Sequence, residues 1–221
     1  MAQDNLRDRI YREYLGRIRR GEIERETRLV DTAIAAQHGV SRMPVREALL
    51  RLTHEGYLVS TTRGFMLPQL SHDEILEIFE LRRLLEPRAA ARATPALTEA
   101  ALERMRRAVA DTHSTISSND IMLFYNASEA FREAWLSAVP NTELRRSIQR
   151  FLGHVQAVRL ATMRDPEAHK IIVLGQTRLL AAFEERDAVA VGDEMLDFVV
   201  AAAASYCKQR VETDLPRLQV D

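Results

Sequence analysis

Cysteine and long apolar runs are scarce in this chain of 221 residues. Its single cysteine, Cys207, cannot form a disulfide within the chain, which suits a reducing compartment. No apolar run approaches the roughly 20 residues that a membrane-spanning helix needs. The N-terminal stretch MAQDNLRDRIYREYL mixes acids with bases and lacks the apolar segment of a secretory signal. These absences predict a cytoplasmic protein without a membrane partner.

The motifs of common catalytic sites are also absent. The sequence has no glycine-rich phosphate loop, no His-Glu-x-x-His motif and no nucleophile beside a plausible general base. Cys207 lies close to an alanine-rich run, which is more typical of a small core residue than of a reactive thiol. His154 and His169 stand alone on predicted helices, where surface or core roles are commoner than catalytic ones. We therefore expect a protein that is not an enzyme.

The net charge of −1 hides an uneven distribution. Residues 1–69, which we name the head, hold 12 Arg against 9 Asp and Glu, a net charge of +3. Residues 70–221, which we name the bundle, hold 19 basic against 23 acidic residues, a net charge of −4. A basic module on an acidic body fits a nucleic-acid-binding protein, although an excess of three charges is common and is weak evidence alone.

Apolar periodicity predicts three helices in the head. Apolar side chains recur at helical spacing over residues 6–20. A short helix is predicted over 32–40, with Asp31 as its N-cap and Gly39 at its end. Ser41 is the N-cap candidate of a third helix that carries an apolar stripe and stops at the next glycine.

A hairpin follows the third helix. The β-prone runs YLVST and GFMLP flank the sequence TRG, which is typical of two strands joined by a glycine turn. The head is therefore predicted to be a winged helix-turn-helix, whose third helix enters the major groove of DNA. Arg42 and Arg46 lie one turn apart at the start of this helix, where the helix dipole disfavours positive charge. Guanine edges or phosphates of double-stranded DNA would compensate for both charges.

The bundle is predicted to be an all-α antiparallel assembly of six helices. The first begins after Ser71, with Glu74 completing a capping box, and Pro87 is expected to kink it or distort it locally. Its apolar residues at helical spacing are Ile75, Ile78, Phe79, Leu81, Leu85 and Ala89. The other helices are expected over residues 98–116, 120–138, 142–163, 167–186 and 188–210.

These motifs resemble the GntR family of bacterial transcription regulators, in its FadR-like subgroup with an FCD-type helical effector domain. The stretch GVSRMPVREALLRLTHEGYL is similar to the family signature around the recognition helix. The stretches IFELRRLLEPRAA and AFREAWLSAVPNTEL are similar to the start and the middle motif of the effector domain. The resemblance spans nearly the whole chain. It implies a homodimer that binds a short palindromic operator, with an affinity that a small carboxylic acid in the bundle alters.

The resemblance also assigns residues that contact DNA. By position they fall at the start of the recognition helix and in the wing: Ser41, Arg42, Met43, Arg46, Arg63 and Gly64. Thr32 stands where many relatives carry an arginine, so one contact to DNA is expected to be lost or weakened.

The bundle departs from the family where many relatives bind a divalent metal. The positions that match the metal ligands hold Ser128, Arg132, Gln176 and Phe198. None of these is a good ligand for a divalent cation, since Arg132 would repel the ion and Phe198 would fill its space. We expect no metal and no other cofactor at this site.

The same departure predicts how an effector binds. Arg132 places a guanidinium where relatives hold a cation, so it is expected to bind the carboxylate of a small organic acid directly. Arg82 and Arg159 are expected to face the same cavity, and Ser128 and Gln176 belong to it by position.

The sequence allows other roles for Arg132 and its pocket. In one, Arg132 forms a salt bridge with a glutamate of the bundle; in another, the pocket is collapsed around Phe198. A long apolar effector of the acyl type is a further possibility, since alanines and the methionines Met122, Met163 and Met195 leave room for it. An all-α enzyme with an accessory winged domain is the alternative from another class, and operator binding separates it from a regulator.

Overall fold

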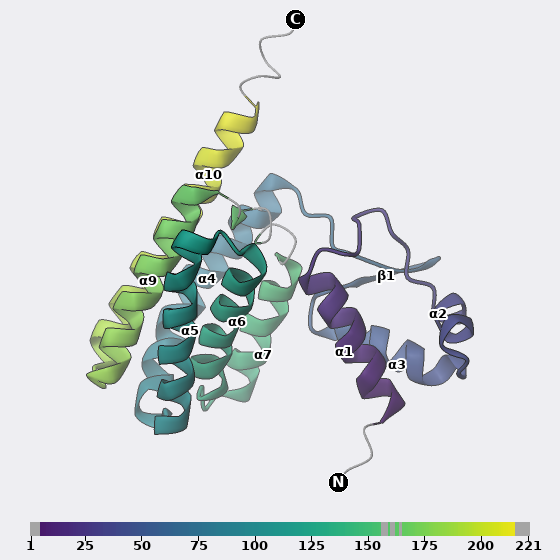
Figure 1. Ribbon diagram of the computed structural model, residues 1–221, viewed down its shortest axis with the longest axis horizontal. Helices are drawn as coiled ribbons and strands as arrows, with labels where there is room; N and C mark the ends of the chain where they lie inside the picture. The colour runs from purple at the N-terminus through teal and green to yellow at the C-terminus, as the bar shows by residue number, and fades with distance from the viewer. Residues whose placement is uncertain (1–4, 156–158, 160–161, 164, 215–221) are drawn as a thin grey trace, which may run out of the picture. The chain divides into compact units, whose positions relative to one another are not determined.

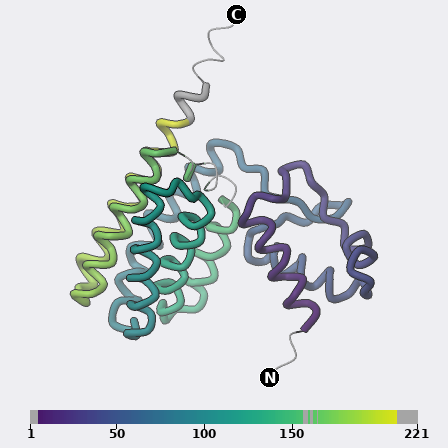
Figure 2. Tube along the Cα trace, viewed as in Figure 1, coloured from purple at the N-terminus to yellow at the C-terminus, as the bar shows by residue number. Residues whose placement is uncertain are grey.

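The computed structural model describes residues 5–155, 159, 162–163 and 165–214. The chain, traced in Figure 2, divides into two compact units. One comprises Met1–Asp73 with Gln149–Leu160, and the other comprises Glu74–Ile148 with Ala161–Asp221. The domain boundary expected between residues 69 and 70 stays a prediction.

The head contains three helices and a hairpin (Figure 1). These elements are α1 (Leu6–Arg19), α2 (Asp31–His38), α3 (Arg42–His54), β1 (Val59–Thr61) and β2 (Gly64–Met66). The two strands pair antiparallel. The predicted winged helix-turn-helix is therefore confirmed, including the turn between the two β-prone runs.

The core of the head joins its three helices to the wing. Each buried aliphatic or aromatic side chain contributes about 1.5–3 kcal/mol relative to exposure in water. The most deeply buried members are Ile10, Tyr14, Ile18, Ile23, Ile34, Val45, Ala48, Leu49, Leu52, Leu58 and Phe65. A backbone bridge fastens the wing, because the Leu29 and Phe65 N–H groups donate to each other's carbonyl oxygens at 2.7 and 2.9 Å.

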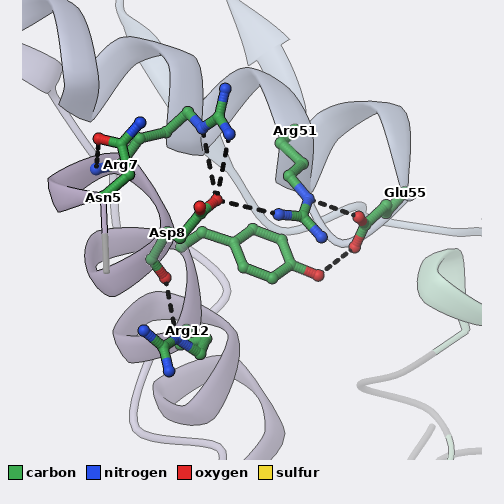
Figure 3. A network of polar contacts seen from close by, with 7 residues as sticks. Asn5, Arg7, Asp8, Arg12, Arg51 and Glu55 are labelled. Atoms are coloured by element: carbon green, nitrogen blue, oxygen red, sulfur yellow. Dashed lines mark hydrogen bonds and ion pairs between the residues drawn. The ribbon is translucent and has the colours of Figure 1, made fainter. Parts of the chain in front are cut away.

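A polar network ties α1 to the C-terminal half of α3 (Figure 3). Tyr11 donates its hydroxyl hydrogen to Glu55 at 2.5 Å, and the Arg51 guanidinium lies 3.8 Å from the Tyr11 ring centroid. Arg51 also donates to Glu55 at 3.0 Å and to Asp8 at 3.3 Å. Burial and the Glu55 contact raise the pKa of Tyr11, which keeps its hydroxyl protonated as the donor. The network fixes one half of α3 and leaves its first turn for other contacts.

The ends of α2 and α3 follow the sequence pattern with one exception. Gly39 ends α2 in the left-handed region at φ 62°, as a C-terminal glycine is expected to do. Ser41 occupies the N-cap position of α3, although its side chain makes no capping hydrogen bond. The prediction that Asp31 caps α2 is wrong. Val30 is the N-cap residue, and the Asp31 carboxylate turns toward α3 instead.

The described part of the bundle is helical and contains no strand. Its elements are α4 (His72–Ala93), the short 3-10 turn η1 (Thr94–Ala96), α5 (Glu99–Ser118), α6 (Ile121–Ser137), α7 (Thr142–His154), α9 (Pro166–Glu184) and α10 (Ala188–Asp214). Helix α5 packs against α6 and α9, and α9 packs against α10. No described helix is long and apolar enough to span a bilayer.

The helix predicted over residues 142–163 is shorter than expected. Helix α7 ends at His154, and Val155 lies in a turn. Gly153 stands in the last turn of α7, where its low helix propensity favours an end to the helix. Part of the remaining prediction lies outside the described residues.

Helix α4 buries a different stripe from the one its leucines predict. The helix continues through Pro87, and Ile75, Ile78 and Ala89 are buried as expected. Leu81, expected in the core, is exposed, and the buried position next to it belongs to Arg82. The helical stripe therefore contains a charged group, which needs a partner inside the bundle.

Candidate DNA-binding cleft and bundle pocket

A cleft of about 410 Å³ opens in the head between the starts of α2 and α3 and the wing. Its wall is polar and carries three arginines. The lining residues are Val30, Asp31, Thr32, Arg42, Arg46, Ser60, Thr61, Thr62, Arg63, Gly64 and Phe65. Four of the six residues predicted to contact DNA therefore meet in one place.

Asp31 links the two arginines of the recognition helix. A single oxygen, Asp31 Oδ2, lies 2.9 Å from Arg42 Nε and 3.3 Å from Arg46 Nη1. The Asp31 side chain is 8% exposed, whereas those of Arg42 and Arg46 are 57% and 49% exposed. Burial raises the pKa of Asp31, but the hydrogen bonds from both arginines outweigh it and hold this pKa below its ordinary value. The carboxylate is thus ionised at neutral pH.

The role of Asp31 was missed in the sequence. One signal was available, because Asp31 stands at the start of α2, shortly before the two arginines that open α3. Sequence spacing does not show that Arg42 and Arg46, which follow Asp31 by 11 and 15 positions, contact its carboxylate in the fold. Part of the negative charge that compensates Arg42 and Arg46 therefore comes from the protein itself.

Three of the predicted DNA contacts are exposed at the start of α3 and on the wing. Met43 is 64% exposed on the first turn of α3, and Ser41 is exposed just before it, but neither lines the cleft. Arg63 is exposed at the tip of the wing, where its backbone N–H donates to Thr61 Oγ1 at 3.2 Å.

Gly64 has a structural reason to be glycine. Its φ is 120°, and a Cβ at this position would lie 2.7 Å from the Leu29 carbonyl oxygen. Both the backbone conformation and the close approach of a neighbouring chain segment exclude a larger residue. Gly64 thus permits the wing to lie against Leu29, next to the arginines.

A second, much smaller pocket lies inside the bundle. Its volume is about 10 Å³, close to the minimum for one water molecule. The four residues that match the family's metal positions, Ser128, Arg132, Gln176 and Phe198, all line it. The other lining residues are Glu86, Phe131, Trp135, Leu179 and Met195.

Phe198 reduces the volume of this pocket by packing onto α9. A Cβ added to Gly175 would lie 2.3 Å from Phe198 Cδ2, so the ring occupies space that only a glycine leaves open. The ring of Phe198 thus lies against Gly175 of α9, and the expectation that it takes the place of a metal stays a prediction. Among the described residues, no group of three or more His, Cys, Asp or Glu is arranged to hold a metal ion.

The charged groups of the bundle pocket are paired within the protein. Arg132 Nη1 lies 2.6 Å from Glu129 Oε1, and both side chains are 15% exposed. Arg82 Nε lies 2.7 Å from Glu86 Oε1 in a pair that is almost fully buried. Two neutral groups contrast with these pairs: Ser128 Oγ and Gln176 Oε1 are buried and have no hydrogen-bond partner among the described residues.

Two of the arginines predicted for the effector do not line this pocket. Arg82 is directed to Glu86, which occupies the wall in its place. Arg159 belongs to the other compact unit of the chain. Neither is among the described residues that line the pocket, and their part in effector binding stays a prediction.

The winged head with its arginine-lined cleft and the helical bundle together define a class of protein, the DNA-binding regulators that carry a second, helical domain. Comparison with known proteins agrees with this class. Residues 6–65 match the model of the bacterial regulatory proteins of the gntR family, and residues 77–201 match the FCD domain. The chain belongs to the gntR family and carries an FCD domain. It is a DNA-binding transcription regulator and not an enzyme.

Individual relatives extend over most of the chain. The Nta operon transcriptional regulator of Aminobacter aminovorans is 28% identical over 84% of this chain and 85% of its own length. The HTH-type transcriptional regulator LutR of Bacillus subtilis is 31% identical over 80% of this chain and 87% of its own. The solved structure of E. coli McbR/YncC has a TM-score of 0.76 at 24% identity and covers 93% of this chain and 99% of that one, which shows a shared fold.

Proposed function

We propose that this regulator binds a palindromic operator as a homodimer in the bacterial cytoplasm and responds to a small organic acid bound in the bundle. Arg42 and Arg46 contact guanine edges or phosphates, and Arg63 contacts the backbone from the wing. The observation that carries the operator contacts is the cleft itself. It gathers three arginines beside the first turn of the recognition helix, and two of them are about half exposed.

Operator binding is testable without knowledge of the natural site. Wild-type protein is used to select duplexes from a random-sequence pool, and the enriched sequence is called the selected duplex. A gel shift with the selected duplex and with a scrambled duplex of the same composition is expected to show clear preference for the first. Selection that enriches no sequence, over several rounds at low salt, would contradict operator recognition.

The bundle pocket supports the effector part of the proposal. Ser128 Oγ and Gln176 Oε1 line the same pocket as Arg132 and have no hydrogen-bond partner in the part of the chain that the structure describes. A buried polar group without a partner costs about 1–3 kcal/mol. A ligand carboxylate competes with Glu129 for Arg132, and its other polar atoms bond to Ser128 and Gln176. Because the pocket is small, this binding requires Phe198 to leave its place over Gly175.

A thermal-shift screen of small mono- and dicarboxylates tests this site. The expected result is a stabilising compound whose effect disappears in Arg132→Ala and weakens in Ser128→Ala. Arg107→Ala, which removes an exposed arginine of α5, serves as the control. A best compound that stabilises Arg132→Ala as well as wild type would show that Arg132 is structural. Stabilisation by long uncharged compounds alone would replace the carboxylate with an acyl-type effector.

An exposed apolar surface on α4 and α10 supports the homodimer. The two helices run antiparallel, because Phe79 contacts Tyr206 while Gly192 lies beside Pro87 and Ala91. We name as the α4–α10 face the exposed residues Leu81, Leu84, Val189, Leu196 and Val200.

Helix geometry places these residues on one side. At about 100° per residue, Leu84 lies about 60° around α4 from Pro87, and Leu196 lies about 40° around α10 from Gly192. In an antiparallel pair, rotations of the same sign turn both side chains to the same side of the contact.

A second copy of the chain is the proposed occupant of this face, since one recognition helix reads few base pairs and a palindrome needs two. Sedimentation at micromolar concentration is expected to give a dimer, and a monomer with and without DNA would contradict it.

A further inference from the structure

Asp31 contacts both arginines through one oxygen, and this leaves much of each guanidinium available. A guanidinium has five N–H donors in a planar fork. Arg42 donates to Asp31 through Nε, so the contact does not use its Nη1–Nη2 edge. Arg46 donates through Nη1, so the contact does not use its Nε–Nη2 edge. Each arginine therefore retains a two-donor edge, the shape that binds the O6 and N7 atoms of guanine.

The contact also restricts two flexible side chains. A free arginine loses rotamer entropy when it is fixed on a partner. Asp31 lies at the start of α2 with its side chain 8% exposed, so burial in the head restricts the carboxylate that both arginines contact. The cost of ordering Arg42 and Arg46 is therefore met in part before DNA arrives.

The Asp31 carboxylate favours specific binding by ordering the arginines, but it weakens binding to DNA of any sequence. Affinity for DNA of any sequence comes mainly from positive charges near the phosphates. Asp31 subtracts one charge directly beneath two arginines that lie at the start of the recognition helix. It therefore weakens attraction to phosphates while it keeps the arginines oriented toward base edges.

We propose that Asp31 is a positioning residue that raises the sequence specificity of DNA binding by holding Arg42 and Arg46 as an ordered pair. It touches no base itself, because its side chain is almost fully buried beneath them. The inference rests on the proposed contacts of Arg42 and Arg46 with DNA. It adds that specificity and total affinity change in opposite directions when the carboxylate is removed.

The test compares Asp31→Asn and Asp31→Ala with wild type on the selected and scrambled duplexes. Asparagine keeps the size of the side chain and one acceptor oxygen, so it protects against simple loss of the fold. We expect the ratio of the two affinities to fall on the order of tenfold, since one bidentate arginine contact contributes about that much discrimination or more. The scrambled duplex is expected to bind the Asp31 variants more tightly than it binds wild type. Its affinity for the variants should also depend more steeply on salt concentration.

Glu47→Gln is the matched control. Glu47 is exposed on α3, and no described contact joins it to Arg42 or Arg46, so the change removes the same charge without releasing the pair. It is expected to raise affinity for both duplexes by similar factors and to leave their ratio unchanged.

A repeated selection with Asp31→Asn identifies the mechanism. The base preferences that it loses are expected to be those that Arg42→Ala or Arg46→Ala also loses. A fall in both affinities with an unchanged ratio would make Asp31 a purely structural residue and overturn the inference. If Arg46→Ala itself leaves binding unaltered, the proposed DNA contacts fail, whereas an effect of Arg46→Ala without any effect of Asp31→Asn overturns only the role of Asp31.

Discussion

Arg46 of the head and Arg82 of the bundle each contact a buried carboxylate, but the two arginines are left in different states. Arg46 shares one oxygen of Asp31 with Arg42 and keeps half of its side chain exposed. Arg82 pairs with Glu86, four residues away on the same helix, and its side chain is only 8% exposed. The exposed arginines can offer their remaining donors to an outside partner, whereas burial keeps Arg82 from one.

Arg132 stands between these two cases. Its guanidinium is paired with Glu129, as in an internal pair, but it borders a pocket whose Ser128 and Gln176 groups have buried atoms without partners among the described residues. The comparison predicts that changes at Arg82 affect folding, changes at Arg46 affect DNA binding, and changes at Arg132 affect ligand binding. The following substitutions test the assignments to folding and DNA binding, together with the dimer and the buried histidine.

The largest effect is expected for Arg82→Ala. The change leaves Glu86 buried without its cation, and breaking a buried ion pair from one side costs about 3–5 kcal/mol of folding free energy. Thermal unfolding of the variant should start well below that of wild type. The control is Arg146→Ala, which breaks an exposed pair with Glu143 and should change stability by no more than about 0.5 kcal/mol. Equal stability of the two variants would contradict an internal role for Arg82.

A smaller but still large effect is expected for Leu84→Glu on the α4–α10 face. A leucine removed from both sides of a symmetric interface costs about 3 kcal/mol or more, so the dissociation constant of the dimer should rise at least about 100-fold. Sedimentation should then show monomer at concentrations where wild type is dimeric. Leu174→Glu, a similarly exposed leucine of α9, is the control and should leave the dimer intact. Dissociation by the control alone would move the interface to another face.

Arg46→Ala is expected to lower affinity for the selected duplex by about 1–3 kcal/mol and to relax preference at one base pair of each half-site. Arg107→Ala removes the same charge from the bundle and should leave affinity nearly unchanged. Titration of both variants at several salt concentrations measures the difference. Identical curves for Arg46→Ala and wild type would show that the cleft of the head is not the site of base contact.

The smallest effect concerns the pH dependence of stability. His169 Nε2 lies 2.9 Å from Thr115 Oγ1, and its ring lies 3.8 Å from that of Phe124. Burial lowers the pKa of His169, so below the ordinary histidine pKa of about 6.5 the unfolded chain binds more protons than the folded one. This contribution to stability is present above that pH and is lost as the pH falls below it.

Thermal unfolding followed from about pH 7.5 to about pH 5.5, on either side of the ordinary histidine pKa, measures this loss. His169→Gln should show a smaller decrease than wild type, and the residual part includes His154, whose pKa is lowered by burial and by Arg150. His54→Gln, an exposed histidine of the head, is the control. A wild-type decrease that His169→Gln leaves unchanged would assign the dependence to other groups.

The head was predictable from the sequence because its signals are local. Apolar spacing in α1 and α3, Gly39 at the end of α2 and the turn of the wing each depend on neighbouring residues, and the structure has all of them. The contact of Asp31 with Arg42 and Arg46 was not predictable, because it depends on how α2 lies against α3. The N-cap prediction failed for the same reason: the carboxylate has a stronger partner in two cations than in a backbone N–H.

The sequence predicted most helices of the bundle, but it only partly predicted which side chains are buried. The apolar stripe of α4 suggested Leu81 as core, whereas Arg82 and Glu86 are buried because they neutralise each other inside. The convergence of Ser128, Arg132, Gln176 and Phe198 on one pocket followed from the family resemblance. The small volume of that pocket did not, because it depends on Phe198 packing over Gly175 of another helix.

The most direct test of the account is the protection of individual arginines from chemical modification by DNA. The full-length protein is treated with an arginine-selective dicarbonyl reagent, with and without the selected duplex, and modified positions are quantified by mass spectrometry. We expect strong protection of Arg42, Arg46 and Arg63, and no protection of Arg107 or Arg146, which are exposed arginines of the bundle. Equal modification of the head arginines with and without the duplex, or protection confined to the bundle, would contradict the assignment of the cleft as the DNA-binding site.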